Sequence, residues 1–189
     1  MNNRTVSIRD WLKLLLIMTA IGGCGAREES SRISSPDRAA RAEVRLDAQG
    51  GGQEIIRARE DLPRNRLWVL TLSEVRVYNT AATGKKLIRK IALPTWSVIG
   101  FHNVCMPDMA LDRAGSAYIS SNGQARLLRI DADRFELRDL AISFPERDGL
   151  DSGFGALAFA ADGTLFARTT PGGLLWKIDV AKSSATMAA

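Results

Sequence analysis

The chain has 189 residues, of which 46% are hydrophobic and 25% charged, and this composition excludes a wholly disordered protein. Lys and Arg number 26 against 21 Asp and Glu, giving a net charge of +5, and the length suggests one domain with an appendage. Two cysteines and one histidine exclude a disulfide-rich scaffold and a usual zinc site built from these residues alone.

Residues 1–23 have the features of a bacterial export signal. A basic start containing Arg4, Arg9 and Lys13 precedes the apolar run 14–21, and Gly22-Gly23 follows. The run is about half the length that a membrane-spanning helix needs. We therefore predict a processed signal peptide rather than a permanent span.

The four residues Ile21-Gly22-Gly23-Cys24 resemble the lipobox of bacterial lipoproteins. The resemblance implies that Cys24 receives a diacylglyceryl group, that the chain is cut just before it, and that acyl chains hold the protein in a membrane. The predicted location is the bacterial cell envelope, facing the periplasm. Gly25 in place of Asp favours the outer membrane under the enteric sorting rule. The alternative is a conventional signal that happens to precede a cysteine.

A flexible spacer is predicted for residues 24–62. Residues 25–62 contain seven Arg and eight acidic residues without sustained periodicity, and Gly50-Gly51-Gly52 would end any helix there. An edge strand is predicted at 54–59. The folded domain is then expected over residues 63–189.

The domain contains an internal repeat. Residues 109–120 align with 157–168 at an offset of 48 without a gap, so that Gly115 falls on Gly163 and Tyr118 on Phe166. The match continues downstream, where both copies end a strand in Ile-Asp at Asp131 and Asp179. A more divergent first copy contains three strands, expected at Leu67–Thr71, Val75–Tyr78 and Leu87–Leu93.

Short β-rich segments separated by Gly, Asn and Asp turns, with no long helical period, predict an all-β fold. A repeat near 45 residues with about four strands is typical of propeller blades. The fold class predicted is therefore a partial or truncated β-propeller of about three four-stranded blades. Trp68, Tyr118, Phe166 and Trp176 are expected to fill the space between neighbouring sheets.

The pattern Leu-Ala-Phe-x-x-Asp-Gly-Thr-Leu-Phe, followed by Leu-Leu-Trp-Lys-Ile-Asp, resembles blades of the NHL, YVTN and SMP-30/gluconolactonase-like propellers over residues 65–182. The resemblance implies an architecture and leaves the activity open. Closed propellers have about four to eight blades. Three blades leave three alternatives: a truncated propeller, a homodimer that closes a ring, or an open stack of sheets.

Two sets of residues are candidates for chemistry. His102 and Cys105, with Asn103 as a nominal third partner, allow Cys–His catalysis as an alternative to a structural loop, which we favour. With Cys24 acylated, Cys105 is expected to be a free thiol, and a disulfide between Cys105 and Cys24 is the alternative if lipidation fails. The acidic candidates are Asp108, Asp112, Glu146, Asp148 and Asp151.

Gluconolactonase-like enzymes hold a divalent ion at the propeller axis, and this resemblance makes Asn103, Asp108 and Asp151 conceivable oxygen ligands. None of them matches the family's motif, so no metal, cofactor or catalytic residue is assigned. The acids are interpreted as turn caps and solvated loop residues.

The only basic cluster of the domain consists of Lys85, Lys86, Arg89 and Lys90. It is interpreted as a solvated strand and turn, too small and too poor in aromatic residues for nucleic-acid binding. The leading hypothesis is a lipid-anchored binding or assembly module without catalysis, whose ligand is a protein or a small molecule. A divalent-metal-dependent hydrolase of the gluconolactonase type is the alternative.

Overall fold

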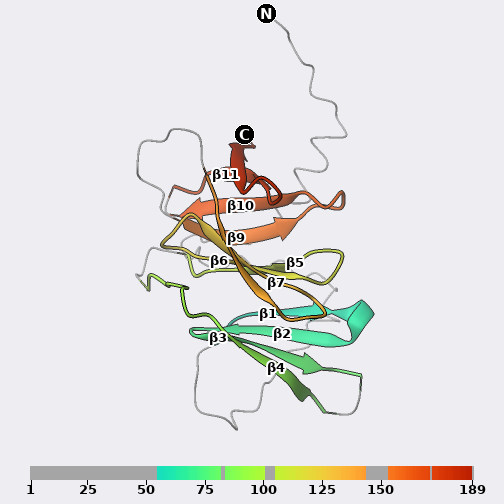
Figure 1. Cartoon of the computed structure of the whole chain (residues 1–189). Helices are drawn as coiled ribbons and strands as arrows, with labels where there is room; N and C mark the ends of the chain where they lie inside the picture. Colours follow the sequence, from blue (N-terminus) through green and yellow to red (C-terminus); the bar gives the residue numbers. More distant parts are fainter. Residues whose placement is uncertain (1–54, 82–83, 101–104, 144–152, 171, 189) are drawn as a thin grey trace, which may run out of the picture.

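The computed structural model describes residues 55–81, 84–100, 105–143, 153–170 and 172–188. Within these ranges the regular structure is β except for the short 3-10 turn Leu62–Arg64. The strands form three antiparallel four-stranded sheets. The predicted all-β, propeller-like fold with three blades is confirmed, and the described sheets form an open stack in chain order (Figure 1).

Each sheet is a meander of four consecutive strands. The first contains β1 (Ile55–Asp61), β2 (Arg66–Thr71), β3 (Glu74–Asn79) and β4 (Lys86–Ala92). The second contains β5 (Met109–Leu111), β6 (Ala117–Ser120), β7 (Arg126–Ile130) and β8 (Leu137–Ala141). The third contains β9 (Gly153–Phe159), β10 (Leu165–Thr170), β11 (Leu175–Asp179) and β12 (Ser184–Met187). The inner strands β1, β5 and β9 lie next to one another in that order.

The folded part begins earlier than the sequence indicated. Strand β1 lies within residues 24–62, assigned to the spacer, at the place where an edge strand was also predicted. Strand β1 is the edge of the first sheet, so the edge strand predicted at 54–59 belongs to the folded part. No helix among the described residues is long and apolar enough to cross a bilayer, and the predicted signal peptide 1–23 lies outside these residues.

The 48-residue repeat is visible in the backbone of the first hairpin of the second and third sheets. Gly115 and Gly163 both adopt positive φ, 79° and 85°. In each hairpin the glycine N–H donates to the carbonyl three residues earlier, that of Asp112 or Ala160, at 2.9 Å. Glycine tolerates this backbone conformation without steric cost. The alignment of the two glycines thus reflects one shared turn geometry.

The repeated Ile-Asp pair has the same physical explanation. Asp131 accepts hydrogen bonds from the backbone N–H groups of Asp133 and Arg134, and Asp179 accepts one from Lys182, at 3.0–3.1 Å. Such side-chain to backbone bonds favour a tight turn. These bonds lower the pKa of both carboxyl groups below the ordinary value of 3.8. The aspartates therefore cap the turns that lead into β8 and β12.

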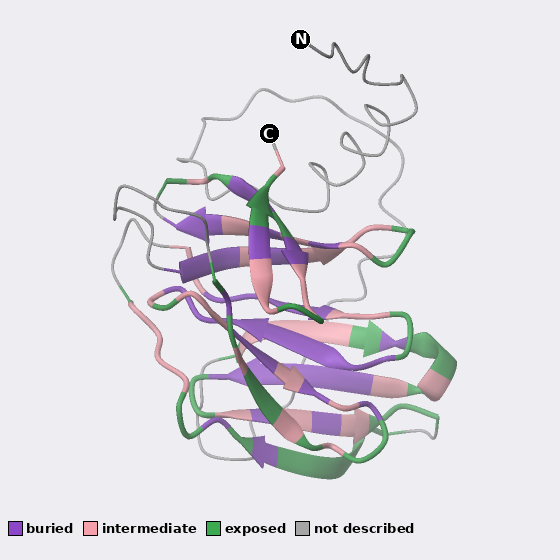
Figure 2. Cartoon of the chain, turned by 45° about the horizontal axis from the view of Figure 1, so that its top comes forward, coloured by how far each residue is buried: buried purple, intermediate pink, exposed green. Residues whose placement is uncertain are grey.

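Two hydrophobic cores lie between the sheets. The first joins the first and second sheets around Trp68, Leu70, Met109 and Ile130, and the second joins the second and third sheets around Phe154 and Trp176. Their buried strands occupy the middle of the stack (Figure 2). Burying a side chain such as Leu or Phe contributes about 1.5–3 kcal/mol, so these two interfaces provide most of the stabilisation.

The predicted large apolar residues are distributed unevenly. Trp68 lies in the first core, and Tyr118 and Trp176 lie in the second. The prediction for Phe166 is wrong, because this side chain belongs to a small cluster with Leu175 instead of filling the space between two described sheets. Tyr118 and Phe166 occupy equivalent positions, but only Tyr118 has a following sheet among the described residues to pack against.

Glycines allow the third sheet to approach the second closely. A Cβ on Gly153 would lie 2.4 Å from the carbonyl carbon of Asn122 and from the oxygen of Ser121. The N–H of Phe154 donates to that same oxygen at 2.8 Å. Because the obstructing atoms are backbone, a side chain here requires the two sheets to separate.

We expect Gly153→Ala to reduce the free energy of unfolding by about 1–3 kcal/mol, because the methyl group overpacks the contact between the sheets. Denaturant titration measures the loss. Gly100→Ala is the matched control, since a Cβ there meets no atom within 4 Å. Equal stability of the two variants would show that β9 does not lie against the turn after β6.

The lowered pKa values of Asp131 and Asp179 predict a specific acid response. Their ionised forms stabilise the fold fully above the ordinary pKa of 3.8, and this contribution is lost as pH falls through the lower folded values. We expect the double variant Asp131→Asn, Asp179→Asn to lose stability less steeply below this pH than the wild type. Unfolding titrations at several acidic pH values test this, and parallel curves would contradict it.

Candidate functional site

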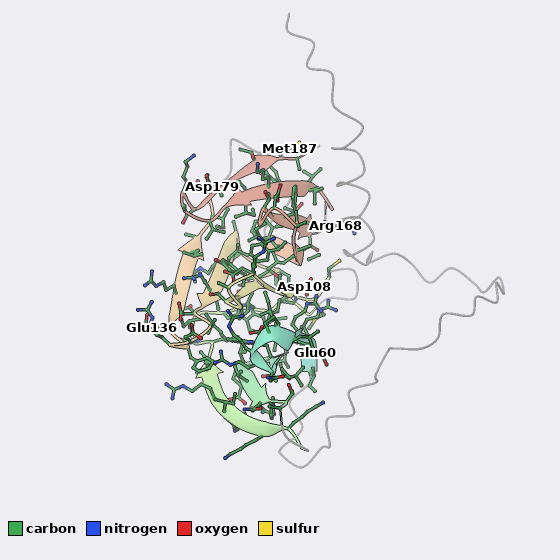
Figure 3. The ribbon with its side chains drawn as sticks, turned by 90° about the vertical axis from the view of Figure 1, so that its right-hand side faces the viewer. Glu60, Asp108, Glu136, Arg168, Asp179 and Met187 are labelled. Carbon is green, nitrogen blue, oxygen red and sulfur yellow. The ribbon has the colours of Figure 1, made fainter. Side chains whose placement is uncertain are left out.

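The most heavily connected polar group lies on the inner strands, at Asp108 just before β5. Its side chain is only 8% exposed. Oδ1 lies 2.8 Å from Nε of Arg57 and 2.9 Å from Nη2 of Arg59, both on β1. Oδ2 accepts the backbone N–H of Leu157 on β9 at 3.1 Å. One carboxylate therefore contacts all three sheets, and Figure 3 shows it near the middle of the stack.

The local backbone fixes this carboxylate. Oδ1 also accepts the N–H of Met109, and the N–H of Asp108 itself donates to Oγ of Ser120, both at 2.8 Å. Ser120 ends β6, the strand paired with β5. Hydrogen bonds within the second sheet thus orient Asp108 toward its partners in the first and third sheets. A buried carboxylate needs such partners, because an unpaired one would be strongly destabilising.

The cluster of Asp108, Arg57 and Arg59 carries a surplus positive charge. Burial lowers the pKa of Arg59, Asp108 opposes the shift, and the nearby Arg57 adds to it. An arginine nevertheless stays protonated near neutral pH. Two cations therefore share one anion. The carboxylate of Asp108 is already engaged by both guanidinium groups and is not free to bind another cation.

Asp108 was one of three conceivable ligands for a divalent ion, with Asn103 and Asp151. The latter two lie outside the described residues, as do Glu146 and Asp148. Asp108 is engaged by two arginines and two backbone N–H groups instead. Within the described ranges, no three His, Cys, Asp or Glu residues are grouped so as to hold a metal ion.

Asp112 acts as the turn cap that the sequence suggested. Its Oδ1 accepts the backbone N–H of Ser116 at 2.8 Å in the hairpin between β5 and β6. Tyr118 follows in β6, and burial raises the pKa of its phenol, while Arg129 opposes the shift. These groups stabilise a hairpin and converge on no open site.

Cys105 is part of a disulfide, so the expectation of a free thiol is wrong. A disulfide sulfur is not a thiolate nucleophile, which excludes Cys–His catalysis by this form of the protein. His102 and Asn103 lie outside the described residues. A Cβ on Gly155 would lie 2.4 Å from Cβ of Cys105, so the cysteine is closely packed against β9.

Sequence reasoning missed the role of Asn122. This side chain is buried and holds the connection between the first and second sheets. Its Oδ1 accepts the N–H of Ile99 at 2.8 Å, and its Nδ2 donates to the carbonyls of Ile99 and Cys105 at 2.8 and 3.0 Å. No local signal marks this contact, because its partners are 17 and 23 residues away.

Two neighbouring bonds fasten the same connection. The indole Nε1 of Trp96 donates to the carbonyl of Ser120 at 2.9 Å, and Oγ of Ser121 donates to the carbonyl of Ser97 at 3.0 Å. The connection is thus bound to the end of β6, next to Asp108. Together these contacts form a rigid polar end of the sheets rather than a reactive constellation.

No protein-family model matches the sequence, and no curated protein is similar to it. The fold and the contacts above are therefore the basis for any statement about function.

We expect Asp108→Ala to reduce the free energy of unfolding by about 2–3 kcal/mol, because it leaves Arg57 without its counter-ion and leaves Arg59 and the N–H of Leu157 without their acceptor. Asp139→Ala is the matched control, since its pair with Arg126 is half-exposed and such pairs contribute about 0–1 kcal/mol. Thermal and denaturant unfolding measure both. Equal losses would contradict a special role for Asp108.

Proposed function

We propose that the protein is a non-catalytic binding or assembly module, held at the bacterial cell envelope by a lipid on Cys24. The observation that carries the first part is the use made of Asp108. Among the described residues Asp61 and Asp108 are the buried acids, and Asp108 is the one that joins the three sheets, through Arg57, Arg59 and Leu157. Because the carboxylate of Asp108 is used to join the sheets, it supports a structural scaffold that binds partners through its surface, rather than a catalytic centre.

The assembly role is supported by the outward side of the third sheet. Phe166 and Leu175 form an apolar cluster there with small residues, Ala156 and Ala158 among them. In the rest of the stack, equivalent faces are covered by a neighbouring sheet. The homodimer suggested by the sequence is part of this proposal, with a sheet of the second copy covering the cluster.

The disulfide of Cys105 supports export but counts against a lipid on Cys24, so the disulfide-bonded chain and the lipidated chain are two alternative forms. Disulfides persist in oxidising compartments such as the periplasm, and Cys105 is in a disulfide. The sequence contains one other cysteine, Cys24. A sulfur that carries a thioether-linked lipid cannot also form a disulfide. The anchoring proposal therefore requires that the lipidated chain has Cys105 as a thiol.

We expect Cys24→Ser to move the protein from the membrane fraction to the soluble fraction, because it removes the atom that carries the lipid. Cys105→Ser is the matched control and should stay in the membrane fraction. In membrane-bound wild type, a maleimide should label Cys105 without prior reduction. Membrane retention of Cys24→Ser after an alkaline wash that removes peripherally bound protein, or a membrane-bound wild type that the maleimide labels only after reduction, would refute the lipid anchor.

A further inference from the structure

The outer edge of the first sheet differs in character from the rest of the molecule. Among the described strands β4 pairs only with β3, so its other side is open. Six of its seven residues are exposed, and only Ile91 is buried. The strand lies at one end of the stack, at the bottom of Figure 1, and its exposure is seen in Figure 2.

Four cations are concentrated here. Lys85, Lys86, Arg89 and Lys90 are all exposed, and residues 84–90 contain no acid. Within the described part of the chain, none of the four is in an ion pair. Some other surface cations are paired, such as Lys182 with Asp179 at 3.3 Å, whereas the exposed Arg138 and Lys177 stand singly and in no ion pair with another described residue. The edge therefore projects an uncompensated positive charge.

Apolar side chains accompany these cations. Leu87 and Ile88 are each 42% exposed, between the two pairs of basic residues. The register with β3 shifts at this point: Val77 faces Arg89 and Tyr78 faces Leu87, which leaves Ile88 without a partner. The strand therefore bulges where its apolar residues lie.

The bulge helps to identify the partner. Bulged, lysine-rich edges resist pairing with a further strand, which disfavours an extended peptide added to the sheet. Nucleic-acid binding is disfavoured because residues 84–90 contain no aromatic side chain for stacking. A better partner than a peptide strand or a nucleic acid is an anionic bilayer. Its headgroups attract basic side chains wherever they lie on the surface, and its interior accepts short apolar side chains.

We propose that the basic edge, defined as residues 85–90, contacts an anionic lipid surface. The four cations lie against the headgroups, and Leu87 and Ile88 enter the boundary with the acyl chains. This contact requires no lipid on Cys24, so it is a second and separate route to the membrane. It orients the stack with its first sheet toward the bilayer and its third sheet away.

The test uses the chain from residue 24 onward with Cys24→Ser, which contains every described residue and no acyl group. The edge variant replaces Lys85, Lys86, Arg89 and Lys90 by Gln. The matched control replaces Arg134, Arg138, Lys177 and Lys182, which are also exposed, so that both variants lose the same charge. Thermal unfolding checks that both remain folded.

Co-sedimentation is measured with phosphatidylcholine vesicles, with and without phosphatidylglycerol, at about 0.1 M salt, where the screening length is about 10 Å. We expect the unsubstituted chain to prefer the anionic vesicles. The edge variant should bind them at least about tenfold more weakly, and the control within about twofold of the unsubstituted chain. A further variant, Leu87→Ser with Ile88→Ser, should lose the binding that resists high salt.

Equal losses in the edge variant and the control would overturn the proposal, because they would reflect net charge alone. Equal binding to both kinds of vesicle would also overturn it. Binding of poly-glutamate that depends on the four cations, without a matching dependence for vesicles, would assign the edge to an acidic polypeptide instead. None of these outcomes bears on Cys24, which the fractionation experiment tests separately.

Discussion

The stack depends on a single buried carboxylate with partners on both sides. Asp108 faces Arg57 and Arg59 of the first sheet through Oδ1 and the N–H of Leu157 in the third through Oδ2. Apolar surfaces pack with little directional preference, so the cores alone would allow neighbouring sheets to slide. A buried charge with fixed hydrogen-bond geometry does not allow this. The position of β1 and β9 relative to β5 therefore depends on this side chain, and for β9 also on the backbone hydrogen bond from Phe154 to Ser121.

Energy and geometry are supplied by different residues in this fold. Trp68 and Trp176 are fully buried and belong to the two apolar interfaces, where most of the stabilisation arises. Asn122 contributes little apolar area, but its amide fixes the connection that leads to Asp108. Loss of either tryptophan would weaken an apolar interface between two sheets. Loss of Asn122 would leave these interfaces intact but would remove the hydrogen bonds that fix the segment between the first and second sheets.

The sequence predicted the parts of the fold whose causes are local. Gly115 and Gly163 repeat because one turn needs positive φ, and Asp131 and Asp179 repeat because each caps its own turn. Strand β12 (Ser184–Met187) forms despite the low β-propensity of its residues, because pairing with β11 and burial of Ala185 compensate.

What the sequence could not predict depends on distant partners. Strand β1 was assigned largely to the spacer because Arg57 and Arg59 do not look like buried positions, and their partner Asp108 is 49 to 51 residues away. Asp108 in turn was indistinguishable from a solvated loop acid. Only the fold shows that the two arginines share this carboxylate, which is also why composition gave no indication of the site.

The molecule contains two kinds of basic residue, those paired inside the stack and those unpaired at its edge. Arg57 and Arg59 are as basic as Lys86 and Lys90, but their charges face a carboxylate inside the stack and hold the sheets together. The charges of β4 have no such partner among the described residues, and they lie where no further sheet is paired. Unpaired charge at an open edge adds no ion pair to the fold and repels its own neighbours, although it also resists pairing with a further strand. Binding to a surface of opposite charge would neutralise the cations of β4, as Asp108 already does in part for Arg57 and Arg59.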